Sequence, residues 1–208
     1  MTTPQRLAPL LAQFDFARKR LTDRMAGPTV NSGNGLDVAV VTMTDHEYRW
    51  EPVPRCWSVR RRSEGPGEAA GFLVGGGEGE WGRDSAPWPH PEPTPFTTLA
   101  WRLCHLTEML WLRSDHTDGT RSLDRDDLPV PGTAAEAVAD FEAAATAWRN
   151  TLLAAGDAAL DTVGYCTYPY GGDAEEPFVE IVWWVNQELL HHGAEIALLR
   201  DLYRYSAH

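Results

Sequence analysis

The segment EPFVEIVWWVNQELLHHGAEIALLRDLYRY, residues 176–205, has the apolar spacing of one long helix. At about 100° per residue, Glu188 and His192 lie on the same helix face, one turn apart. Ile181 and Leu199 share that face, so an apolar surface carries a carboxylate and an imidazole. Burying these two groups unpaired would be costly. We therefore expect both to meet a partner on a facing helix.

A second helix supplies the candidate partner. It is expected from about residue 96 to residue 114, with Thr94 as the N-cap and Pro95 in the first helical position. Its apolar residues form two separate stripes, which indicates a helix at the centre of a bundle. His105 lies in the middle of this helix, so we expect it to face the carboxylate and the imidazole of the last helix.

His105, Glu188 and His192 together offer two nitrogen ligands and one oxygen ligand. Catalytic Zn²⁺ is commonly held by three such ligands with one position open, while Ni²⁺ and Fe²⁺ are alternatives for the same set. Glu195 is expected either as a fourth ligand or as the acceptor that orients His192. His191 is turned away by about 100°. The competing interpretation is a set of core side chains that pair with one another.

Other kinds of site lack their signatures in this sequence. A di-iron bundle needs two Glu-x-x-His motifs and two more glutamates, and the motif is not repeated here. Neither the H-E-x-x-H motif nor the G-x-S-x-G elbow occurs. Gly75-Gly76-Gly77 is followed by no lysine and lies next to Glu78, so it predicts a hairpin or a flexible loop rather than a phosphate cradle.

Two further helices complete an all-α fold. One is expected at about residues 4–25, and another, rich in alanine, at about residues 133–155. The four helices predict a four-helix bundle in a single domain over residues 1–208. A long, irregular, loop-rich insertion at about residues 51–95 separates the first and second long helices. Within it, only the stretch Phe72–Val74 indicates a strand.

Shorter segments carry weaker signals. Thr44 followed by Glu47 has the pattern of a capping box and predicts a short helix. His46, in this polar turn, and His90, between prolines, are expected to be loop residues and not ligands. A polar loop is expected around Asn34-Gly35.

The composition limits the classes of function. The chain has 208 residues, a hydrophobic share of 43% and a net charge of −12. It lacks the basic surface that nucleic acids and anionic membranes require, so we expect neither partner. We read no signal peptide and no membrane-spanning run. The three scattered cysteines predict no disulfide framework and fit a reducing cytoplasm.

Several segments resemble the DinB/YfiT-like superfamily. Residues 97–106, TTLAWRLCHL, are similar to its metal-histidine helix, and residues 188–203 are similar to its final helix. Residues 48–52 and 56–60 resemble its N-terminal part, so the resemblance covers most of the chain. It implies a four-helix bundle that forms a homodimer.

The resemblance also implies a ligand set. Many members carry three histidines, two of them at H-x-x-x-H on the last helix, whereas here Glu188 takes the first position of that pair. The mycothiol-dependent maleylpyruvate isomerase branch is similar in having His, Glu and His around zinc. By this resemblance His105, Glu188 and His192 are the metal ligands, and the departure leaves open the metal and the subclass.

On this resemblance we expect a metal-dependent thiol S-transferase or isomerase that acts on small electrophilic molecules. A low-molecular-weight thiol such as mycothiol or bacillithiol would be the co-substrate, because a thiol bound to Zn²⁺ loses its proton at neutral pH. Trp57, Trp101 and Trp184 are candidate walls of the pocket, with plain core packing as the alternative.

Two other functions remain open at this point. A metal-dependent amide hydrolase would use the same ligands to activate water, with Glu195 or Glu108 as the general base. A non-catalytic, dimeric binding protein would pair the three polar side chains internally and hold no metal.

Overall fold

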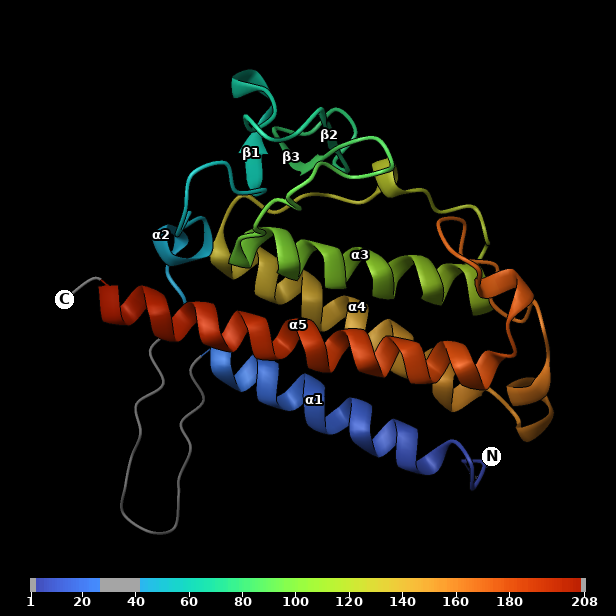
Figure 1. Ribbon diagram of the computed structural model, residues 1–208. Coiled ribbons are helices and arrows are strands. Elements are labelled where there is room, and N and C mark those ends of the chain that lie inside the picture. Colours follow the sequence, from blue (N-terminus) through green and yellow to red (C-terminus); the bar gives the residue numbers. More distant parts are fainter. Residues whose placement is uncertain (1–2, 27–41, 207–208) are drawn as a thin grey trace, which may run out of the picture.

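The computed structural model describes residues 3–26 and 42–206. Within these ranges the chain is mostly helical, with five α-helices and one small three-stranded sheet. Four long helices lie side by side, and the sheet lies over the N-terminal end of one of them, α3 (Figure 1). The four long helices are α1 (Ala8–Ala26), α3 (Leu99–Asp118), α4 (Ala134–Ala154) and α5 (Phe178–Ser206).

All four long helices predicted from the sequence are present, and the apolar periodicity explains their packing. In α1 one face is buried, and its residues are Leu11, Phe14, Ala17, Leu21 and Met25. α3 is buried on most of its circumference, as expected for the central helix. The short helix α2 (Asp45–Tyr48) starts after Thr44, whose side chain accepts a hydrogen bond from the Glu47 N–H. The loop predicted around Asn34-Gly35 lies outside the described residues.

The predicted start of α3 is wrong by one turn. Thr98, not Thr94, is the N-cap, and its side chain accepts a hydrogen bond from the Trp101 N–H. The preceding residues are held extended, because the Trp57 N–H donates to the Phe96 carbonyl at 2.8 Å and the Thr98 N–H donates to the Trp57 carbonyl at 2.9 Å. A contact between distant segments therefore overrides the local capping signal.

The insertion at 51–95 contains a sheet that the sequence pattern largely missed. Its strands are β1 (Val59–Arg61), β2 (Phe72–Val74) and β3 (Trp81–Ser85), with β3 in the centre and antiparallel to both neighbours. The predicted strand is β2. The three glycines after it all have positive φ and form the turn of the β2–β3 hairpin, as expected.

Buried charges explain why β3 has no apolar pattern. Arg83 and Asp84 of this strand are both buried. Asp84 accepts hydrogen bonds from the backbone N–H groups of Ser58 and Gly67 and from the Arg60 guanidinium. The Trp101 indole N–H of α3 donates to the Asp84 carbonyl at 2.8 Å. The sheet is thus attached to the helix that carries His105.

The segment between α4 and α5 closes the opposite end of α3. It contains 3₁₀ turns at Asp157–Asp161 and Asp173–Glu175. The Arg113 guanidinium of α3 binds the Asp173 carboxylate through Nε at 2.8 Å and Nη2 at 3.1 Å. Across the described residues, no helix is both long and apolar enough to cross a membrane.

Candidate metal centre

His105 from α3 and Glu188 and His192 from α5 come together between the two helices. His192 Nε2 lies 3.2 Å from Glu188 Oε2, and His105 Nε2 lies 3.6 Å from the same oxygen. One candidate ligand atom from each residue lies within 4.8 Å of the other two, and within the described residues no other group of this kind occurs. The spacing of four residues brings Glu188 and His192 onto one face, as the sequence indicated.

The ionisation of these groups suits a cation. Burial lowers the pKa of His105. Hydrogen bonds from His105, and then from His192, hold the pKa of Glu188 well below its usual range. A neutral imidazole and an ionised carboxylate are the forms that bind a metal, because a bound proton competes with the ion for the same lone pair.

Glu195 holds the far side of the His192 ring. Its Oε2 lies 2.6 Å from His192 Nδ1, the ring nitrogen opposite the one that faces Glu188. The same carboxylate forms an ion pair with Arg102 of α3. This is the geometry of a carboxylate that fixes the orientation and tautomer of a ligating histidine. His191 is exposed, with its Nε2 at 3.4 Å from Glu195 Oε1.

Two of the three tryptophans considered as pocket walls lie in one aromatic stack. The Trp101 ring stacks on His105 with centroids 5.4 Å apart and planes inclined by 19°. Trp57 lies 6.0 Å from Trp101. The Arg83 guanidinium lies over the Trp101 ring at 4.8 Å. The stack and the hydrogen bond from Trp101 to the sheet fix the position of the His105 ring.

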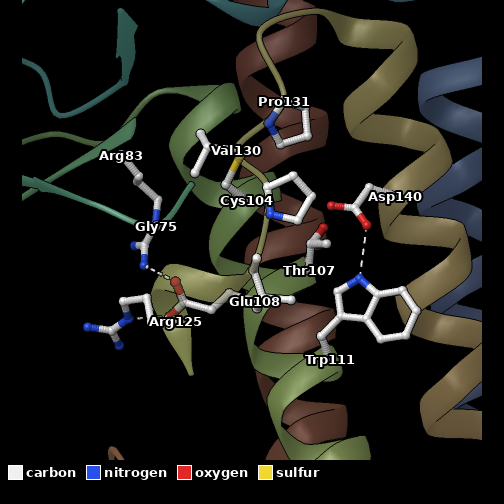
Figure 2. Close-up of a pocket in the computed structure, with 12 residues that line it drawn as sticks. Gly75, Arg83, Cys104, Thr107, Glu108, Trp111, Arg125, Val130, Pro131 and Asp140 are labelled. Atoms are coloured by element: carbon white, nitrogen blue, oxygen red, sulfur yellow. Dashed lines mark hydrogen bonds and ion pairs between the residues drawn. The ribbon is translucent and has the colours of Figure 1, made fainter. Parts of the chain in front are cut away.

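Glu108 lies in a different cluster of charges. Figure 2 shows Arg83 and Arg125 binding its carboxylate from two sides, at 2.7 and 2.9 Å. Burial raises the pKa of Glu108, but the charges of the two arginines outweigh burial and lower it. The adjoining cavity has a volume of only about 20 Å³, which is room for one water molecule. This cavity is too small for a substrate.

A much larger cavity opens beside the three polar residues. It has a volume of about 570 Å³ and is lined by His105, by Trp184 of α5 and by Arg113 and Arg125. This volume is in the range of small-molecule sites. Arg113 was not predicted from the sequence as a site residue. A charged residue on a helix that is apolar on more than one face could have indicated it.

Comparison with known proteins bears on this arrangement. The model of one family, described as the DinB superfamily, matches residues 30–196. The match includes all three residues of the candidate metal centre. No curated protein and no solved structure matches the chain. Because the family model spans most of the sequence, the chain belongs to the DinB superfamily.

Proposed function

We propose that the protein is a metal-dependent thiol S-transferase or isomerase that acts on small electrophilic molecules. The observation that carries the proposal is the cluster of His105, Glu188 and His192, of which His105 lines a cavity of about 570 Å³. The four long helices would form the four-helix bundle of the family. Members of the DinB superfamily often bind a metal, and the donor set found here fits one.

Each residue has a definite task in this proposal. His105 and His192 would give nitrogen ligands and Glu188 an oxygen ligand, a set used for catalytic zinc, with nickel or iron as alternatives. A divalent metal bound there would lower the pKa of a thiol and so supply a thiolate at neutral pH. Trp101 and Glu195 would hold the two imidazole rings in the orientation for binding.

The geometry favours a thiol substrate over activated water. A metal-dependent amide hydrolase would need a free carboxylate as general base, and the candidates are Glu195 and Glu108. Glu195 is held by Arg102 and His192, and Glu108 is held by two arginines. Both carboxylates are thus already bound by cationic or N–H donor groups, and neither is left free for an attacking water. A thiol whose pKa is lowered at the metal needs no such base.

Replacing Glu195 with glutamine tests the orienting role. We expect metal affinity to fall about 10- to 100-fold, because the amide binds His192 Nδ1 less strongly and no longer balances Arg102. Metal still binds when it is in excess, and the fold is unchanged. The measurement is a competition titration against a zinc chelator.

Asp201→Asn is the matched control for this variant. Asp201 lies on the same helix and is also paired with an arginine, Arg24, but it is exposed and far along the helix from the ligands. Its replacement should leave metal affinity unchanged. If the two variants bind metal equally well, Glu195 does not orient His192.

The proposed activity is tested in two steps. Protein purified without a polyhistidine tag and supplied with Zn²⁺ or Ni²⁺ should hold about one divalent ion per chain. The loaded protein is then assayed for transfer of mycothiol, bacillithiol and glutathione to a panel of small electrophiles. Less than a tenth of an ion per chain contradicts the proposal at the first step. Metal binding with hydrolysis of amides, but no thiol transfer, would favour the hydrolase.

We further propose that the protein acts in the cytoplasm as a homodimer. All three cysteines are free and buried, which suits a reducing compartment. α5 leaves several apolar side chains exposed, including Trp183, Leu190 and Leu198. Sedimentation equilibrium, which gives the mass in solution, tests the dimer directly.

A further inference from the structure

Arg113 is the most confined charged side chain of the large cavity. It is only 3% exposed, although it lines the cavity together with His105. Its guanidinium lies between two aromatic rings, 3.9 Å from the centroid of Tyr168 and 4.3 Å from that of Trp184. Asp173 binds Nε and Nη2. The plane and the direction of the guanidinium are therefore fixed.

The third nitrogen of this guanidinium has no acceptor. Arg113 Nη1 is buried, and no described residue offers it a hydrogen bond. A buried charged N–H group without an acceptor costs free energy, because it has lost water and gained nothing in exchange. An acceptor supplied by a ligand in the cavity would recover that cost.

The charges around this side chain favour an anionic acceptor. Arg113 and Asp173 neutralise each other. The neighbouring cluster holds two arginines, Arg83 and Arg125, against the single carboxylate of Glu108 (Figure 2). Arg113 and Arg125 are the two arginines that line the cavity. Counted with Arg83, Asp173 and Glu108, which bind them or lie beside them, they form a cluster of three cations and two anions, in a chain whose net charge is −12. Besides Asp173, the acidic residues that line the cavity are Glu176 and Glu180, and both are exposed to solvent.

The distance from the metal centre sets the size of the ligand. Arg113 follows His105 by eight residues on α3, which is about 12 Å along the helix axis. Trp184, which covers Arg113, lies one helical turn before Glu188 on α5. The cavity therefore extends from His105 to Arg113, between α3, α5 and the loop before α5.

We propose that this cavity binds a small organic carboxylate, with the carboxylate on Arg113 and an apolar body extending toward the metal centre. The part of this inference that concerns the reacting end of the ligand rests on the proposed function. The carboxylate site itself does not, because Tyr168, Trp184 and Asp173 hold Arg113 and none of them is a candidate metal ligand. Arg125, the other cation of the cavity, adds to the positive potential there.

The test compares a carboxylate with its uncharged analogue on the metal-free, full-length protein. In calorimetric titrations 4-phenylbutyrate should bind at least about tenfold more tightly than 4-phenylbutyramide, since a charge-assisted hydrogen bond is worth a tenfold change or more. Arg113→Lys should abolish this preference, because lysine can still pair with Asp173 but lacks the guanidinium fork. Equal affinities for the two probes in the unmodified protein would overturn the inference.

Two further variants serve as a control and as a second, independent test. Arg149→Lys is the matched control, because Arg149 makes the same two-point ion pair with Asp15 on the outer surface, and it should leave the preference unchanged. Asp173→Asn should tighten phenylbutyrate binding several-fold, since it removes the anion that neutralises Arg113. An Asp173→Asn protein with unchanged affinity would contradict the proposal even if Arg113→Lys fails to fold.

Failure of the carboxylate site can be distinguished from failure of the proposed function. Metal content is measured on the same preparations. A protein that binds metal but shows no preference for the carboxylate overturns only the present inference. A protein with an Arg113-dependent preference that never binds metal supports the carboxylate site and contradicts the proposed function.

Discussion

Alanine in place of His105 or Glu188 is expected to lower the affinity for a divalent metal by more than about 100-fold. Loss of a residue that only orients a ligand typically costs 10- to 100-fold, and loss of the ligand removes a bond to the ion as well. Two donors would then remain of the three that lie within 4.8 Å of one another. Any thiol-transfer activity should disappear with the metal.

The matched control for these variants is His191→Ala. His191 is the neighbour of His192 on the same helix, but its side chain is 58% exposed and is not in the group of candidate ligands. Chelator competition and elemental analysis on proteins with the same helical circular dichroism should show normal metal content for this variant. If His191→Ala and His105→Ala lose metal to the same extent, the ligand set is wrong.

The sequence predicted the candidate metal centre because its decisive relations are local. Glu188 and His192 are one helical turn apart, so their common face follows from helix geometry alone. His105 could be chosen because it interrupts the apolar face of a second strongly periodic helix. Once the two helices pack against each other, three side chains in the middle of apolar faces have little alternative to meeting.

The walls of the cavity depend on contacts that no local pattern records. Arg113 pairs with Asp173, which lies 60 residues further along the chain. Strand β3 buries Arg83 and Asp84 instead of apolar residues, so the alternation that identifies a half-buried strand is missing. Only the three-dimensional structure shows that each of these charges has an opposite charge to meet.

Glu47 shows both a contact that the sequence predicted and one that it could not. Its position three residues after Thr44 predicted the short helix α2, and the Thr44 side chain does accept the Glu47 N–H. The sequence also suggested that the Glu47 side chain would complete the capping box. The carboxylate instead binds Nε of Arg200 at 2.6 Å and Nη2 at 3.1 Å, 153 residues away. α2 is thereby attached to α5.

Replacing Glu47 with alanine should therefore destabilise the fold by about 3–5 kcal/mol, because it leaves the buried charge of Arg200 without this carboxylate. Glu47 is 2% exposed and Arg200 1% exposed, so water cannot solvate the guanidinium in place of the carboxylate. For a chain of this size the loss corresponds to a fall in Tm of roughly 6–20 °C. The measurement is urea unfolding of the metal-free protein, followed by circular dichroism.

Asp15→Ala isolates the effect of burial in this experiment. Asp15 binds Arg149 through the same two-point geometry, at 2.7 and 3.0 Å, but both side chains are more than a third exposed. Water can solvate the arginine that remains, so the expected loss is about 1 kcal/mol or less. If the two variants lose equal stability, burial does not set the cost of breaking the pair. A small loss in both would mean that α2 is not held in place by this pair, and that the buried Tyr48, whose hydroxyl group donates to the Pro131 carbonyl, suffices.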